Sequence, residues 1–242
     1  MSNYRQFLII ILVVIIVVTC RVSMAKTLNF SCIEETPDIE ISRLVLAEAY
    51  GRLGIDITIQ ELPGLRALIY ANEGLTDGEL FRAKGIEDEY TNLVRIQVPI
   101  NTVDVVVVTK SFFFKVNGWQ SLKQYSIGIQ SGITFIESII SNIEGLKVIR
   151  VKNSSQLLGM LENERIDIVV APRISALLSL SDLKSKTITI LEPPLQIMPL
   201  FHYLNKKHQS LVPELEDVLQ NMEDEGEIQR IRDDYISSTL SE

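Results

Sequence analysis

Residues 71–85 read ANEGLTDGELFRAKG, and residues 160–173 read MLENERIDIVVAPR. In each stretch a helical pattern leads through an aspartate into a short apolar run that ends on an arginine, Arg82 in the first and Arg173 in the second. A helix followed directly by a buried strand is the repeating unit of a parallel α/β sheet. We therefore expect one such unit in each half of the chain, with each strand ending on an arginine.

The segments around these two stretches alternate in the same way. In the first part of the chain, strands are expected at 26–35, 55–62, 76–82, 92–100 and 104–110, and helices at 41–53 and 65–74. After residue 125, strands are expected at 125–132, 147–152, 166–173, 187–193 and 199–206, and helices at 133–145, 154–165, 174–185, 210–226 and 227–236. The sequence predicts an α/β fold of two units with largely parallel sheets, followed by a helical C-terminal piece.

The N-terminal segment has the pattern of a secretory signal peptide. Arg5 precedes an unbroken apolar run from Phe7 to Val18, which is shorter than the roughly 20 residues that a membrane-spanning helix needs. Ser23, Met24 and Ala25 form a small-residue cleavage site, so we expect residues 1–25 to be removed and the protein to be periplasmic. The alternatives are an uncleaved anchor and a lipoprotein signal in which Cys20 is lipidated.

Charge and cysteine content exclude several classes of protein. The formal net charge is −8, and residues 1–25 contribute two arginines and no acid, so the exported chain is more acidic still. Such a chain is a poor partner for nucleic acid or an anionic membrane surface. Cys32 is the one cysteine after the cleavage site, so an intramolecular disulfide is excluded there. We expect Cys32 to be a buried structural thiol. We also expect the protein to be a monomer without a cofactor.

The sequence carries no familiar catalytic or metal-binding motif. The two histidines, His202 and His208, have no obvious nucleophile beside them, and GIQSG at 128–132 is out of register for a nucleophile elbow. No phosphate-binding loop, dinucleotide fingerprint or zinc spacing is present. Glu34 and Glu35 point to opposite faces of a strand and cannot act as a pair. Glu35 remains a ligand-binding candidate at the end of the first strand.

The segment QSGITFIE, residues 130–137, predicts an anion seat in the second unit. A strand ends at Ser131 and Gly132, and a helix begins near Thr134, whose N-terminal end presents unpaired N–H groups and a positive dipole. Gly132 would admit a ligand to the backbone, and the Thr134 hydroxyl would add a donor. The alternative is plain capping of this helix by Ser131 or Thr134.

Three arginines are further ligand-binding candidates. Arg82 and Arg173 end strands, and ligands of open α/β sheets bind beyond the carboxyl ends of the strands. Arg66 lies in the first turn of a helix, where a positive charge is unfavourable without an anionic partner. The alternatives are a surface position for Arg66 and a solvated strand end or structural ion pair for the other two. If Arg82 binds only ligand, Arg82→Ala should abolish binding and leave the melting temperature unchanged.

Four segments together resemble a known family. They are 62–82 (LPGLRALIYANEGLTDGELFR), 119–137 (WQSLKQYSIGIQSGITFIE), 157–173 (LLGMLENERIDIVVAPR) and 215–231 (LEDVLQNMEDEGEIQRI). In order and spacing they are similar to the family 3 periplasmic solute-binding proteins of ABC transporters, which include amino-acid binders. The resemblance implies a two-lobe (type II) fold with hinge strands near 104–110 and 197–201. Lobe 1 would be 26–106 and 199–242, and lobe 2 would be 107–198.

The chain departs from that family where an amino acid would be anchored. By the resemblance, the arginine that binds the ligand carboxylate would fall near Tyr90 and Thr91, and the aspartate that binds the amine would fall at Pro172 or Arg173. Neither is present, whereas the glycine and threonine of the lobe 2 seat are kept as Gly132 and Thr134. The departures favour an anionic ligand, because guanidinium groups match carboxylates in a two-pronged geometry.

Three functions fit the sequence. The first is capture of a small, carboxylate-like ligand between two lobes, for delivery to a separate ABC permease or a membrane sensor. The second is an enzyme on the same fold, of dehydratase or lyase type, since fold alone does not decide function. The third is a non-transporting member that binds a protein partner, which an exposed apolar patch at 111–116 (SFFFKV) would favour.

Overall fold

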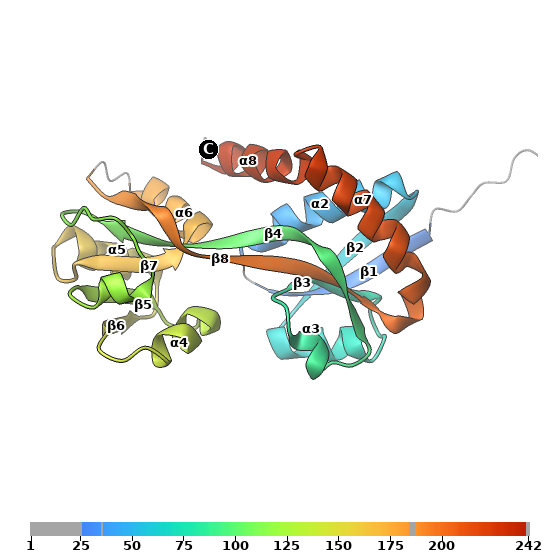
Figure 1. The fold of residues 1–242 in the computed structure, drawn as a ribbon, viewed down its shortest axis with the longest axis horizontal. Coiled ribbons are helices and arrows are strands. Elements are labelled where there is room, and N and C mark those ends of the chain that lie inside the picture. Colours follow the sequence, from blue (N-terminus) through green and yellow to red (C-terminus); the bar gives the residue numbers. More distant parts are fainter. Residues whose placement is uncertain (1–25, 35, 184–186, 241–242) are drawn as a thin grey trace, which may run out of the picture.

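The structure is a computed structural model that describes residues 26–34, 36–183 and 187–240. It forms two α/β lobes that share one curled sheet of eight strands in the order β2-β1-β3-β8-β4-β7-β5-β6 (Figure 1). The predicted two-lobe α/β fold is therefore confirmed. The predicted signal peptide lies outside the described residues.

Lobe 1 contains the parallel strands at one end of the sheet. The helices of lobe 1 cover both faces of its three parallel strands. The strands are β1 (Lys26–Ile33), β2 (Ile55–Leu62) and β3 (Gly78–Arg82). The helices are α2 (Asp38–Arg52), α7 (Val212–Asp224) and α8 (Glu227–Thr239) on one face and α3 (Gly64–Asn72) on the other. A short 3-10 turn, η1 (Ile86–Asp88), follows β3.

Lobe 2 repeats this arrangement at the other end of the sheet. Its strands β5 (Ser126–Gln130), β6 (Lys147–Val151) and β7 (Ile168–Pro172) are parallel. Its helices are α4 (Thr134–Ser141) on one face and α5 (Ser154–Glu162) and α6 (Arg173–Leu183) on the other. The 3-10 turn η2 (Trp119–Leu122) leads into β5.

Two strands of 17 residues each, β4 (Leu93–Thr109) and β8 (Thr189–Asn205), run through both lobes as an antiparallel pair. The sequence predicted each of them as two strands, interrupted at Asn101 and Thr102 in one and at Pro193 and Pro194 in the other. The predicted interruptions were wrong. The β4–β8 register shifts at the irregular residues, and the pairing continues on both sides of each shift. A 3-10 turn, η3 (Lys206–Leu211), follows β8.

The run Val105–Val108 places this part of hinge strand β4 in the core of lobe 2. Val105 and Val107 pack in the core under α4, whereas Val106 and Val108 pack in the core under α5 and α6. All four side chains are buried, as expected of a strand that is covered on both faces. The continuous valine run therefore fixes β4 in the middle of the lobe 2 sheet.

The last helix, α8, crosses from lobe 1 towards lobe 2 (Figure 1). Its end lines a small cavity together with the first two turns of α6. The residues around this cavity are Ile174, Leu177 and Leu178 on α6, and Tyr235, Ile236, Thr239 and Leu240 at the end of the chain. The C-terminal piece thus lies close to lobe 2 as well as packing on lobe 1.

Gly78 is required by the close approach of β3 to β8. A methyl group added at Gly78 would lie 2.1 Å from the backbone carbonyl oxygen of Tyr203, a distance that no carbon atom tolerates. Gly51, on the exposed side of α2, has no atom within 4 Å of such a methyl group and is a matched control.

We expect Gly78→Ala to lower the melting temperature strongly, because β3 must move away from β8 and lose ladder hydrogen bonds. Gly51→Ala should leave stability unchanged or raise it by about 0.5–1 kcal/mol, the usual gain from replacing glycine in a helix. Thermal unfolding followed by circular dichroism measures both. Equal melting temperatures for the two variants would contradict the packing described here.

Candidate functional site between the lobes

The strand register shows that the carboxyl ends of the two half-sheets face each other. β8 enters lobe 1 from lobe 2 and pairs first with Arg82, at the end of β3, and then with Gly78, at its start. β4 enters lobe 2 from lobe 1 and pairs first with Pro172, at the end of β7, and then with Ile168. Both strand ends therefore point towards the other lobe, which is where ligands bind in open α/β sheets.

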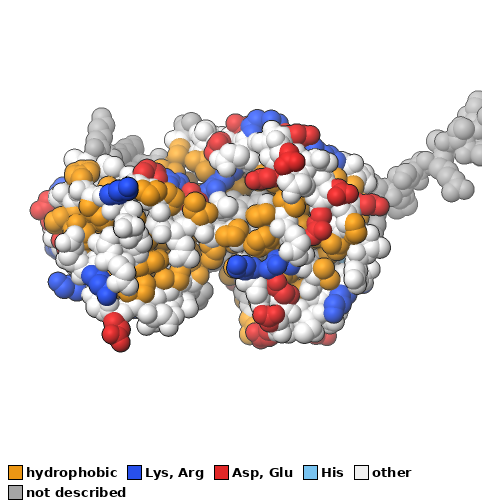
Figure 2. Space-filling view, viewed as in Figure 1, with side chains coloured by type: hydrophobic (Ala, Val, Ile, Leu, Met, Phe, Trp, Pro, Cys, Tyr) orange, Lys and Arg blue, Asp and Glu red, His pale blue; other side chains and the backbone are white. Residues whose placement is uncertain are grey.

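A groove separates the lobes at this place. Figure 2 shows it as a hollow that is open to solvent on the side away from α8, with apolar side chains on both walls and Lys or Arg side chains on the wall of lobe 1. The hinge strands β4 and β8 form its base (Figure 1). The groove is the candidate functional site.

Arg82 lies at the lobe 1 edge of the groove and is held in a fixed position. Its Nε donates to Oε1 of Glu79 at 2.7 Å, and its Nη2 lies 2.6 Å from the same oxygen. Nη2 also donates to the carbonyl oxygen of Gly64 at 3.0 Å. Within the described part of the chain Nη1 has no hydrogen-bond partner, and the side chain is 15% exposed. The guanidinium therefore keeps one donor group for an incoming molecule.

Glu79 is not among the predicted ligand-binding residues, but it forms the structural ion pair that was the alternative for Arg82. It lies three positions before Arg82, and residues three apart on a regular strand point to opposite faces. A break in the β3–β8 register between the two residues brings their side chains together. Glu79 is fully buried, and its Oε2 accepts a hydrogen bond from the Ser31 hydroxyl at 2.6 Å. A glutamate near the predicted arginine was the available signal, but the bulge that joins them has no mark in the sequence.

Burial raises the pKa of Glu79 to about 7, against the opposing effects of the Arg82 charge and of the hydrogen bonds from Ser31 and Arg82. The carboxyl group therefore titrates close to neutral pH. Its charge state decides whether Arg82 presents a full positive charge or a neutralised pair to the groove.

Arg173 begins α6, whereas the sequence placed it at the end of a strand. All three of its guanidinium nitrogens are bonded to carboxylates. Nε donates to Asp104 on β4 at 3.1 Å, and Nη1 and Nη2 donate to the two oxygens of Glu192 on β8 at 2.7 and 3.1 Å. Arg173 therefore ties lobe 2 to both hinge strands, which corresponds to the structural ion-pair alternative.

Asp104 extends this ion pair to the C-terminal helix. Arg232 on α8 lies 3.4 Å from Asp104 and also contacts the Thr102 hydroxyl. Asp38, at the start of α2, lines a second small cavity together with Asp104 and Arg232, and it accepts a hydrogen bond from Asn101 at 3.4 Å. Burial raises the pKa of Asp38 to about 6. The hinge thus carries a cluster of charges that connects both lobes and α8.

The predicted lobe 2 seat lies at the start of α4. Gly132 has φ +94°, and its N–H donates to Oε1 of Glu137 at 3.3 Å. The N-terminal cap residue is Ile133, which makes no side-chain capping bond, so Ser131 does not occupy the cap position. Thr134 is the first residue of α4, and its side chain lies outside what the structure describes.

The other two sequence candidates are placed as follows. Arg66 is exposed in the first turn of α3, and no hydrogen bond or ion pair joins it to the described residues. Glu35 lies outside the described residues. Trp119 donates from Nε1 to Gln196 on hinge strand β8 at 3.1 Å.

The two histidines have structural partners. His202 is buried, and its Nδ1 lies 3.1 Å from the carbonyl oxygen of Leu80, which can only accept. Nδ1 therefore carries the proton, and Nε2 accepts from the Tyr50 hydroxyl at 2.9 Å. Burial lowers the pKa of His202 to about 4. His208 pairs with Asp77 at 2.6 Å, at the start of β3 and away from the groove.

The described residues contain neither a metal-binding cluster nor a membrane-spanning helix. No group of three or more His, Cys, Asp or Glu side chains among them could hold a metal ion. No helix among them has the length and apolar character needed to cross a bilayer.

Comparison with known proteins supports the fold. No family model matches the chain. A protein of Shewanella oneidensis, described as uncharacterized, is 26% identical over 201 residues, which cover 79% of this chain and 74% of that protein. The GluR0 ligand-binding core, solved with L-glutamate, matches with a TM-score of 0.65 and 13% identity over 88% of this chain and all (100%) of its own.

Two further solved structures come from transport and sensing. The second substrate-binding domain of a putative amino acid ABC transporter from Streptococcus pneumoniae has a TM-score of 0.65 and 16% identity, covering 86% of this chain and 99% of its own. A histidine kinase sensor domain with similarity to periplasmic binding proteins has a TM-score of 0.62 and 9% identity, covering 87% and 96%. The chain has the two-lobe fold of these periplasmic-binding-protein-like domains, the type that the sequence resemblance named.

The Arg82–Glu79 pair leads to a stability prediction that differs from the expectation drawn from sequence. Arg82→Ala should lower the melting temperature at pH 8, because it leaves a buried carboxylate without its partner. Since Glu79 can take up a proton instead, the loss is limited to about 1.4 kcal/mol for each pH unit above its pKa of about 7. The folded-state pKa of Glu79 lies above its unfolded value, so the penalty grows as pH rises through that pKa and fades below it.

Differential scanning fluorimetry at pH 5.5 and pH 8 measures this effect. Arg66→Ala removes an exposed arginine from α3 and should leave the melting temperature unchanged at both pH values. A melting temperature of Arg82→Ala that equals that of the unchanged protein at pH 8 would contradict the buried pair.

Proposed function

We propose that this protein is a periplasmic ligand-binding protein that captures a small carboxylate-bearing molecule in the groove between its lobes. The observation that carries the proposal is the position of Arg82, which stands at the carboxyl edge of lobe 1 with Nη1 directed to no described partner. Closure of the two lobes about β4 and β8 would bury a ligand held there.

The way Arg82 is fixed supports an anionic ligand. Glu79 and the Gly64 carbonyl hold its Nε and Nη2, so little side-chain freedom is left to lose on binding. The exposed side chain of Arg66, on the helix that starts at Gly64, would supply a second positive charge. A pre-positioned guanidinium with a mobile second cation suits a carboxylate or a dicarboxylate.

Lobe 2 would contribute backbone donors. In the proposal, the N-terminal end of α4 with Gly132 and Thr134 faces the ligand, and Glu137 gives up its weak bond to the Gly132 N–H on binding. We place Arg173 outside the ligand contacts, because Asp104 and Glu192 already bind it. Glu35 stays a candidate at the end of β1.

The partner of the proposed function is a separate membrane protein, either an ABC permease or a sensor. Domains of both kinds occur among the proteins that share the fold. The proposal includes export by the N-terminal segment and a monomeric protein with no affinity for nucleic acid, in keeping with its acidic charge.

A thermal-shift screen of residues 26–242 tests the proposal. The panel would hold dicarboxylates, sugar acids, aromatic acids and neutral, acidic and basic amino acids. A molecule that binds only the folded state raises the melting temperature by an amount set by its concentration and Kd. We expect acids to raise it and neutral or basic amino acids to have no effect.

The same screen on two variants locates the binding site. Arg66→Ala should weaken the binding of acids by about tenfold or more in Kd, because a hydrogen bond to a charged group is worth about 1.5–3 kcal/mol. Arg165→Ala removes an exposed arginine before β7, at the edge of lobe 2 that faces away from the groove, and should have no effect. A response to neutral amino acids alone would show a zwitterion site instead of an anion site.

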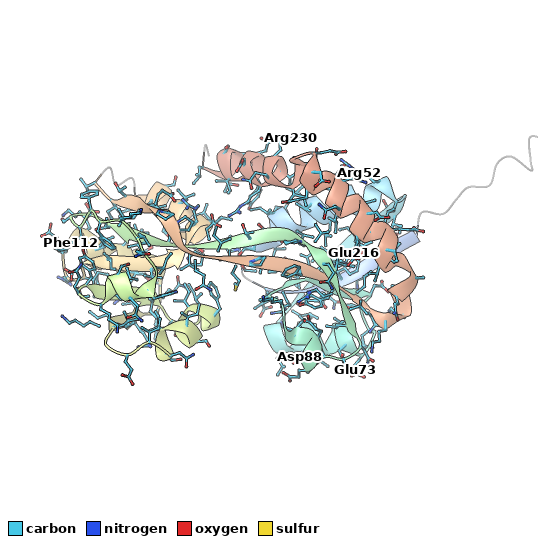
Figure 3. All side chains as sticks on the ribbon, in the orientation of Figure 1. Arg52, Glu73, Asp88, Phe112, Glu216 and Arg230 are labelled. Carbon is cyan, nitrogen blue, oxygen red and sulfur yellow. The ribbon has the colours of Figure 1, made fainter. Side chains whose placement is uncertain are left out.

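Binding of a protein partner is the second candidate function, and one observation favours it. Phe112 and Phe113 are 40% and 68% exposed, and Figure 3 shows Phe112 at the outer end of lobe 2, away from the groove. If no small molecule shifts the melting temperature, this aromatic segment becomes the better candidate for the functional surface.

A further inference from the structure

Glu79 has a hydrogen-bond network that can serve both of its protonation states. When the carboxyl is ionised, the Ser31 hydroxyl donates to its Oε2 at 2.6 Å. When it is protonated, Glu79 can donate to the Ser31 oxygen, and the Ser31 hydrogen can turn to the carbonyl oxygen of Ala67 at 2.9 Å. Neither state leaves a buried polar group unpaired, so the site can exchange a proton without rearrangement.

The groups around Glu79 make Arg82 its dominant charged neighbour. From β1 the neighbours are the Ser31 hydroxyl and the Cys32 thiol, whose pKa is raised by burial. From β8 the nearest titratable groups are Tyr203, opposite Glu79 in the ladder, and neutral His202. The turn before β3 adds the Thr76 hydroxyl, which bonds to Ser31 at 3.2 Å, and α3 adds backbone carbonyls.

The charge that Arg82 offers to the groove therefore depends on Glu79. With Glu79 ionised, the pair is neutral overall and attracts an anion weakly. With Glu79 protonated, the guanidinium carries an uncompensated positive charge, and its Nη1 has no hydrogen-bond partner among the described residues. An anion at Nη1 would in turn favour the protonated form of Glu79, because coupling between two binding events acts equally in both directions.

We propose that Glu79 is the positioning residue that sets the charge preference of the groove, and that an anion binds to Arg82 together with one proton taken from solvent by the Glu79 carboxylate. This inference rests on the proposed function. The near-neutral pKa of Glu79 supports it, since proton uptake would then occur within the physiological pH range. Affinity for a carboxylate should fall up to about tenfold for each pH unit above that pKa.

Acetate, the smallest carboxylate, is the probe for this proposal, with chloride at equal ionic strength as the reference. Protein labelled with 13C at glutamate carboxyl carbons would be titrated from pH 5 to pH 9, and the Glu79 signal identified by its loss in Glu79→Gln. We expect acetate to raise the pKa of Glu79 relative to chloride. The 15Nε signal of Arg82 reports independently whether acetate is bound.

Two variants complete the experiment. Glu79→Gln mimics the protonated state, since its amide can donate to Ser31 and its oxygen can accept from Arg82, and it should bind acetate with an affinity that is independent of pH. Glu40→Gln removes the acid of the surface Glu40–Arg43 pair, which has the same three-residue spacing, and should leave the pH dependence unchanged.

The outcomes separate the two proposals. An Arg82 signal that responds to acetate while the Glu79 pKa stays the same overturns the proton coupling and leaves the anion site intact. An Arg82 signal that does not respond to acetate at any pH overturns the anion site, and the inference about Glu79 falls with it. A raised Glu79 pKa, together with pH-independent binding by Glu79→Gln, supports both.

Discussion

The antiparallel pairing of β4 and β8 is the constraint on which the rest of the molecule depends. Each strand begins in one lobe and ends in the other, so their register fixes which end of every parallel strand points towards the hinge. The carboxyl ends of β3 and β7 face each other for this reason alone. The groove, its donors and its base all follow from one ladder of backbone hydrogen bonds that joins two otherwise separate cores.

The ladder is backed by ion pairs where the backbone pairing is least regular. Between Val105 and Val107 the β4–β8 register shifts, and Glu192 lies in the displaced part of β8. Arg173 bonds to Glu192 on one hinge strand and to Asp104 on the other, which holds the irregular segment between lobe 2 and the pair. The Arg173 charge, which its sequence position made a ligand candidate, is thus used in the ion pairs of the hinge. The groove is therefore less positive than the three arginines of the sequence suggested.

Local patterns were sufficient to predict the alternation of strands and helices, because most elements are short and end on glycine or a turn. The strand at 104–110 and the C-terminal helices were predicted for that reason. The continuity of β4 and β8 was not, since Asn101 and the Pro193–Pro194 pair look like chain breakers and only the partner strand shows that pairing resumes. Likewise, the partner of Arg82 depends on a bulge, and those of Arg173 lie 19 and 69 residues away.

The Arg82–Glu79 pair shows how an arginine can be fixed in position while its net charge stays adjustable. A guanidinium alone at a strand end would be flexible and hydrated, and a bound ligand would have to restrain it. Glu79 and Gly64 restrain Arg82 in advance, at the cost of cancelling part of its charge. Burial then weakens the ionised form of Glu79, so the restraint survives while the cancellation can be relieved by a proton. Rigidity and charge, which usually compete in an arginine–glutamate pair, are separated here because the carboxyl group is fully buried whereas the arginine side chain keeps 15% of its surface exposed.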